Sequence, residues 1–295
     1  MTIMEPFFRE VGDGPGVVCL HANASTSGQW RGLMDLLAPR FRVFAPDSYD
    51  SGKSPHWPSD RVIHLRDEVA LIEPVLTRAG SPLALVGHSY GAAVALIAAL
   101  ANPRRVRAMA LYEPTLFALL DAKTSAPNEA DGIRNVVTEA GLALDAGNQD
   151  DAAARFIDYW MGTGTWAKTH VQRKPSIALS VTNVRRWGHA LFTEPTRLEA
   201  FRSLDVPVLY TAGKRSTPSA RGVARLLVSA LPRVELVEFE NLGHMGPVTH
   251  PDLVNEAIRR FLEKSTLPSG CSRLAGSFLP FPEPASRESV HVGEE

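Results

Sequence analysis

The segment around Ser89 constrains the possible folds of this chain most strongly. Residues 83–86 form an apolar run that leads into Gly87-His88-Ser89-Tyr90-Gly91, and small and aliphatic residues follow over 92–101. This order predicts a strand, a sharp turn and a helix. Glycines two positions before and after the serine would let the strand and the helix approach closely, while the turn lifts the hydroxyl above the sheet edge. The alternative is an ordinary glycine-rich connection without a nucleophile.

Short apolar runs recur along the chain and alternate with stretches of helical periodicity. The runs cover residues 16–21, 41–46, 83–88, 106–112, 206–212 and 234–239. This alternation predicts an α/β fold with a mostly parallel central sheet flanked by helices.

One long insertion sets the domain organisation. Roughly ninety residues, 114–205, separate the fourth and fifth apolar runs, whereas loops in α/β units usually have ~2–6 residues. We therefore expect a helical cap over 114–205 and a core formed by 1–113 and 206–264. Trp160, Trp166 and Trp187 fall within the cap, where they either pack helices together or line a substrate pocket. Prolines among polar residues predict a flexible C-terminal tail over 265–295.

The composition argues against several functional classes. With 31 Lys and Arg against 32 Asp and Glu, the formal net charge is −1, and no run of basic residues indicates nucleic-acid binding. The longest apolar run, 92–101, is shorter than the ~20 residues that span a bilayer, and residues 1–10 lack the apolar region of a signal peptide. Cys19 and Cys271 suggest neither a disulfide framework nor a metal site. We therefore expect a soluble, cytoplasmic protein.

Two further motifs, together with the Ser89 turn, resemble the α/β-hydrolase family with a helical cap, over about residues 7–262. His21-Ala22-Asn23 follows a strand-like run where the family usually has His-Gly-x, and residues 45–54, Ala-Pro-Asp-Ser-Tyr-Asp-Ser-Gly-Lys-Ser, resemble the family's A-P-D-x-x-G-x-G-x-S loop. The resemblance implies that the backbone N–H groups of Asn23 and Tyr90 form an oxyanion hole. Ala22 and Asp50 replace glycines of the family pattern, and Asn23 has the alternative role of a plain turn residue.

Nine histidines compete for the role of the base that a serine hydroxyl needs at neutral pH. His244 follows the last strand-like run and precedes a C-terminal helix, where the resemblance places the catalytic histidine. We expect the side chain of His88 to leave the turn on another side, and His21 to shape the oxyanion loop. His250 lies six positions after His244, but no carboxylate or cysteine cluster accompanies this pair to indicate a metal site.

The third member of such a site is a carboxylate that orients the imidazole. Many members of the resembled family carry it in G-x-x-D after the strand that follows the cap, but this chain has Gly213-Lys214-Arg215-Ser216. Glu113, after the run 106–112, is the acid that a subset of the family implies, and it keeps the chain order Ser89, Glu113, His244. Otherwise Glu113 would cap a helix or pair with an arginine. This assignment predicts little effect from replacing Ser216 by alanine.

These residues predict a serine hydrolase that cleaves carboxylic esters or related acyl compounds through an acyl-enzyme. Such chemistry needs a small-molecule acyl substrate and no metal or organic cofactor. Thioesterase, lactonase, amidase and perhydrolase activities would use the same groups. A non-catalytic ligand-binding protein on the same fold is the alternative from another class, and the sequence leaves the oligomeric state open.

Overall fold

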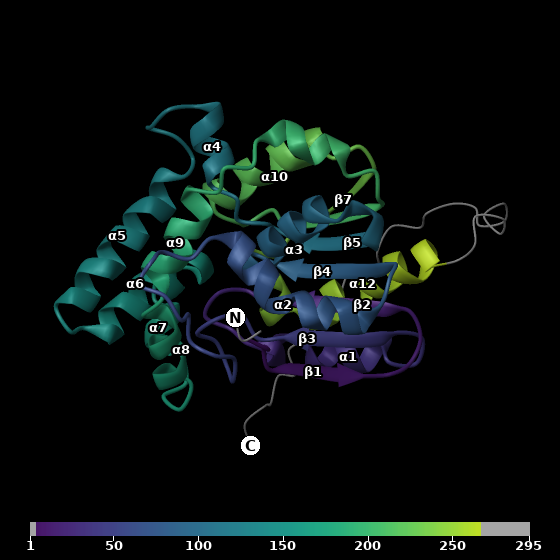
Figure 1. Ribbon diagram of the computed structural model, residues 1–295. Coiled ribbons are helices and arrows are strands. Elements are labelled where there is room, and N and C mark those ends of the chain that lie inside the picture. The colour runs from purple at the N-terminus through teal and green to yellow at the C-terminus, as the bar shows by residue number, and fades with distance from the viewer. Residues whose placement is uncertain (1–3, 267–295) are drawn as a thin grey trace, which may run out of the picture. The chain divides into compact units, whose positions relative to one another are not determined.

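A seven-stranded sheet forms the centre of the computed structural model, which describes residues 4–266 (Figure 1). The strand order is β1-β3-β2-β4-β5-β6-β7, and neighbouring strands are parallel except at β1, which runs antiparallel to β3. This arrangement confirms the predicted α/β class. The strands are β1 Phe8–Val11, β2 Gly16–Leu20, β3 Arg42–Pro46, β4 Leu83–His88, β5 Val106–Tyr112, β6 Val208–Gly213 and β7 Val234–Phe239.

The first strand, β1, is absent from the sequence prediction. It has only four residues, of which Arg9 and Glu10 are charged, and none is buried. A short edge strand of this kind carries no apolar run, because only one of its edges pairs with the sheet. It pairs along β3, with Phe8 opposite Pro46 and Val11 opposite Val43.

Helices cover both faces of the sheet and bury two apolar clusters. Along β2, Val17 belongs to one cluster and Val18 to the other, as the two-residue period of a strand requires. The first cluster packs against α1 Arg31–Leu37 and α12 Pro251–Thr266. The second packs against α2 Leu65–Ala79, α3 Tyr90–Ala101 and α10 Pro218–Ala230. The remaining short core helices are η1 Ser27–Trp30, η2 Pro103–Arg105 and α11 Gly246–Thr249.

The long insertion between β5 and β6 is helical, and we keep the name cap for residues 114–205. In Figure 1, helices α5 to α9 gather at the end of the sheet on the left of the view. Phe117, Phe156 and Trp187 belong to the same apolar cluster as the core residues Leu85 and Leu111, so the cap shares a buried interior with the sheet. The cap elements are α4 Ala118–Lys123, α5 Asp131–Asp145, α6 Gln149–Met161, α7 Thr165–Lys168, α8 Lys174–Val181, α9 Val184–Phe192 and η3 Leu198–Ser203.

The first two residues of the predicted tail, 265–295, belong to α12. Ser265 and Thr266 end α12, and residues 267–295, including Cys271, lie outside the described part of the chain. Cys19 is a free thiol buried in β2, and burial raises its pKa. Across residues 4–266, no helix has both the length and the apolar character that a membrane crossing requires.

Candidate active site

Ser89 lies on the turn between β4 and α3 in a strained backbone conformation. Its φ is +56° and its ψ is −116°, a region that costs a non-glycine residue about 1–3 kcal/mol. A Cβ atom at Gly87 would lie 2.5 Å from Cα of Ala92, and one at Gly91 would lie 2.3 Å from the carbonyl oxygen of Leu20. Both glycines are therefore required by close backbone approaches.

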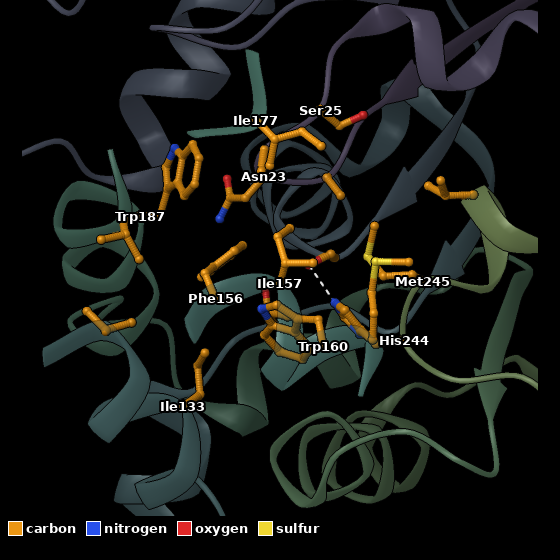
Figure 2. Close-up of a pocket in the computed structure, with 18 of the residues that line it drawn as sticks. Asn23, Ser25, Ile133, Phe156, Ile157, Trp160, Ile177, Trp187, His244 and Met245 are labelled. Atoms are coloured by element: carbon orange, nitrogen blue, oxygen red, sulfur yellow. Dashed lines mark hydrogen bonds between the residues drawn. The ribbon is translucent and has the colours of Figure 1, made fainter. Parts of the chain in front are cut away.

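The structure brings Ser89, His244 and Glu113 together in a hydrogen-bonded row. The Ser89 hydroxyl lies 2.9 Å from Nε2 of His244, and Nδ1 of His244 lies 2.7 Å from Oε2 of Glu113. Figure 2 marks the serine–histidine contact with a dashed line at the His244 ring. All three residues are buried. With Nδ1–H donating to the carboxylate, Nε2 is free to accept the serine proton.

Glu113 has a second anchored oxygen besides the one that faces His244. Its Oε1 accepts hydrogen bonds from the Gly213 amide at 2.7 Å and from the Ser216 hydroxyl at 2.6 Å. The backbone at Glu113 has φ +43°, which turns the chain out of β5 at this point. The sequence analysis missed the hydrogen bond between the Ser216 hydroxyl and Glu113. A serine in the place of the more usual acid was the one available signal.

His88 supports the loop that carries the base. Its Nε2–H donates to the carbonyl oxygen of His244 at 2.8 Å, and its Nδ1 accepts from the Gln29 amide at 3.1 Å. This pattern requires a neutral ring, and burial, followed by the charge of His244, holds the pKa of His88 well below its usual value. Tyr112 adds a second support, because its hydroxyl donates to the carbonyl of Gly243 at 2.7 Å.

The two predicted oxyanion donors come from different elements. Tyr90 is the first residue of α3, so its amide N–H has no partner within that helix. Asn23 is half-buried and lines the same cavity as Ser89; Figure 2 labels its side chain. His21 secures this loop: its Nδ1–H donates to the Ala22 carbonyl at 2.7 Å and its Nε2 accepts from the Ser48 amide at 3.0 Å.

A cavity of about 400 Å³ lies between the core and the cap and contains Ser89 and His244 on its wall. Trp160 and Trp187 line it, whereas Trp166 does not and instead donates from its indole N–H to Asp150 at 3.0 Å within the cap. The wall is mainly apolar, as Figure 2 shows, and includes Ile133, Phe156, Ile157, Trp160, Ile177 and Trp187.

Trp160 stacks on the ring of His244. The two ring centroids are 4.0 Å apart and the planes differ by 28°. A cap side chain thus covers one face of the His244 imidazole. The sequence offers no signal for this contact, because it depends on how α6 docks over a loop more than eighty residues later in the chain.

A buried carboxyl, Glu68, lies behind the nucleophile turn. It accepts hydrogen bonds from the Tyr90 hydroxyl and from the Tyr49 amide, both at 3.2 Å. Burial raises the pKa of Glu68 to about 8; the two hydrogen bonds lower it in part, while Asp50 and Asp67 raise it further. The Glu68 carboxyl thus ties α2 to the first residue of α3.

His250 lies apart from this row. It is exposed and its Nδ1 lies 2.9 Å from the hydroxyl of Thr249. Within residues 4–266, no three His, Cys, Asp or Glu side chains are grouped so that they could hold a metal ion.

The fold and the hydrogen-bonded row of Ser89, His244 and Glu113 together define a class of protein. A family profile described as "alpha/beta hydrolase fold" matches residues 15–251, and the chain belongs to that family.

Individual relatives are more distant. The chain is 25% identical over 266 residues to a pimeloyl-[acyl-carrier protein] methyl ester esterase from Aeromonas hydrophila, covering 85% of this chain and 96% of the relative. It is 23% identical to an (E)-2-((N-methylformamido)methylene)succinate hydrolase from Acinetobacter baylyi, covering 86% and 92%. Among solved structures, an α/β hydrolase enzyme from a Medee basin deep-sea metagenome library superposes with a TM-score of 0.75 at 16% identity, covering 90% and 96%.

Proposed function

We propose that this protein is a serine hydrolase that cleaves carboxylic esters through an acyl-enzyme, with Ser89 as nucleophile, His244 as base and Glu113 as the acid that orients it. One observation carries the proposal: the hydrogen-bonded row from the Ser89 hydroxyl through both ring nitrogens of His244 to the Glu113 carboxylate. The esterase and hydrolase names of the relatives support it.

In the first half-reaction, Nε2 of His244 takes the Ser89 proton while Oγ attacks the acyl carbon. The carbonyl oxygen gains negative charge, which the amides of Asn23 and Tyr90 stabilise by hydrogen bonding. The imidazolium, held by Glu113, then gives its proton to the leaving alcohol oxygen as the C–O bond breaks. The alcohol leaves and the acyl group stays on Ser89.

In the second half-reaction, water replaces the alcohol. His244 takes a proton from the water, the hydroxide oxygen attacks the acyl carbon, and the same amides hold the oxyanion. The bond to Ser89 Oγ breaks as His244 returns the proton to it. The products are a carboxylic acid and the restored serine.

The test is turnover of a p-nitrophenyl acyl ester by the unaltered protein and by Ser89→Ala. We expect the substitution to abolish turnover while circular dichroism shows a folded protein, because the proposed acyl intermediate forms on the Ser89 hydroxyl. Retained hydrolysis by Ser89→Ala would overturn the serine mechanism.

A fluorophosphonate probe separates the enzyme from a ligand-binding protein on the same fold. An activated serine reacts covalently with the probe, and Ser89→Ala should remain unlabelled. A panel of thioester, lactone and amide substrates then distinguishes ester hydrolysis from other acyl transfers that use the same groups.

A further inference from the structure

The part of the cap that covers the cavity has an uneven charge. Between Asp158 and Glu194 the sequence contains five Lys and Arg residues and no Asp or Glu, although the chain as a whole is nearly neutral. The five are Lys168, Arg173, Lys174, Arg185 and Arg186. This segment includes α7, α8 and α9, two of which contribute residues to the cavity wall.

Two of these five cations form ion pairs with acidic residues of the protein. Arg185 forms an ion pair with Asp145 at 2.5 Å, and Arg186 forms one with Asp50 at 2.8 Å. The remaining three, Lys168, Arg173 and Lys174, make no ion pair with any residue in the range 4–266, although Lys174 lies over the Trp166 ring.

Arg173 is the cation that reaches the cavity. It lines the wall immediately before α8, and its carbonyl accepts the first-turn hydrogen bond of that helix from Ile177, which also lines the cavity (Figure 2). The rest of the wall, as far as the described residues define it, contains no Asp or Glu and no second Lys or Arg. Among the described residues, Arg173 is therefore the one Lys or Arg side chain on a mainly apolar wall.

We propose that the preferred substrate of this site is an ester whose acyl part carries a carboxylate, separated from the scissile carbonyl by an apolar chain, and that Arg173 binds this carboxylate. The proposal rests on the proposed function, because it names the substrate class of the Ser89 reaction. Apolar walls take up the methylene chain. The planar guanidinium offers paired N–H donors that match a carboxylate.

The charge of the cap acts before binding as well. The positive charge of Arg173 at the wall attracts anionic substrates and raises their local concentration. A carboxylate also meets no negatively charged side chain on the cavity wall. A neutral substrate gains nothing from either effect.

The experiment compares two substrate series of equal chain length. One is the mono-p-nitrophenyl esters of linear α,ω-dicarboxylic acids, and the other is the p-nitrophenyl esters of the corresponding monocarboxylic acids. The quantity followed is the ratio of kcat/KM for the charged ester to that for the neutral ester. Because Arg173 lies at one position on the cavity wall, we expect the ratio to peak at one chain length.

The variants are Arg173→Gln, with Arg173→Lys to restore the charge and Lys168→Gln as a matched loss of a cation that does not line the cavity. Arg173→Gln should lower the charged-to-neutral ratio about 5- to 20-fold, the range between an exposed ion pair and a hydrogen bond to a charged group. Arg173→Lys should recover part of the ratio, and Lys168→Gln should leave most of it.

Three results would overturn the inference. They are a wild-type protein that does not prefer the charged ester at any chain length, an Arg173→Gln variant with an unchanged ratio, and equal losses in Arg173→Gln and Lys168→Gln. If Ser89-dependent hydrolysis of the neutral esters persists in these cases, the proposed function stands and only the substrate class is wrong. If neither series shows Ser89-dependent turnover, the proposed function fails together with this inference.

Discussion

The hydroxyl of Ser216 donates a 2.6 Å hydrogen bond to Oε1 of Glu113, and both residues are buried. Ser216 occupies the position after β6 where many members of the family carry their acid. In this protein it hydrogen-bonds Glu113, which follows the neighbouring strand β5. Sequence alone predicts little effect from removing the Ser216 hydroxyl. The hydrogen bond reverses that expectation.

Ser216→Ala should lower kcat for a p-nitrophenyl ester by about 5- to 150-fold, because loss of a donor to a buried carboxylate costs about 1–3 kcal/mol. KM should change less, since Ser216 does not line the cavity. Steady-state kinetics measure both quantities. Ser229→Ala, whose hydroxyl bonds an exposed carbonyl in α10, is the control. An unchanged kcat in Ser216→Ala would mean that the hydrogen bond does not help to orient Glu113.

Glu113→Gln should reduce kcat by about 10³- to 10⁴-fold, as loss of a triad carboxylate does elsewhere. The amide can offer an N–H to the imidazole and thereby favour the wrong tautomer. The double variant Glu113→Gln with Ser216→Asp places a carboxylate at the more usual family position. We expect it to be at least tenfold faster than Glu113→Gln alone. Similar, mild losses in Glu113→Gln and Ser216→Ala would show that neither residue supplies the acid.

Trp160→Ala should lower kcat/KM about 5-fold, because the stacked ring that holds one face of His244 is lost. Trp160→Phe keeps an aromatic ring there and should retain most activity. Trp166→Phe is the matched control, since Trp166 is buried in the cap away from the cavity. Equal effects of the alanine and phenylalanine substitutions on kcat/KM would argue that stacking is not what the indole contributes.

Glu68 should make the free energy of unfolding depend on pH. Its pKa is raised from 4.5 to about 8 in the folded protein, so the unfolded chain releases this proton at lower pH than the folded one. Stability from this group is complete below about pH 4.5 and falls as the pH rises toward 8. Urea unfolding at several pH values should show a flatter profile for Glu68→Gln than for wild type.

The control for this comparison is Glu73→Gln on the same helix, at a side chain that is 52% exposed. It should keep the wild-type dependence on pH. Parallel profiles for wild type and Glu68→Gln would show that Glu68 is ionised in the folded protein throughout the range.

The sequence predicted those elements whose conformation is determined by residues close to them in the chain. The turn at Ser89 needs two glycines at fixed positions, and the apolar runs of the parallel strands are buried on both faces. The position of His244 follows from its place between the last strand and the last helix. The structure brings both residues together with Glu113, the acid implied by the resemblance to a subset of the family.

Other contacts depend on distant segments and leave no local pattern. Strand β1 is short and half-exposed, so it lacks the periodicity of a buried strand. Two contacts join the cap to the core: Trp160 stacks on His244, and Arg186 forms an ion pair with Asp50. Both depend on how the cap docks on the core, which the spacing of residues in the sequence does not predict. The same limit applies to which tryptophans reach the cavity.

A single amide side chain connects the oxyanion loop to the loop of the base. Gln29 accepts from the Ala22 amide at 3.1 Å and donates to His88, which in turn donates to the carbonyl of His244. These groups all belong to the core, so the hydrogen bonds that align the two loops involve no cap residue.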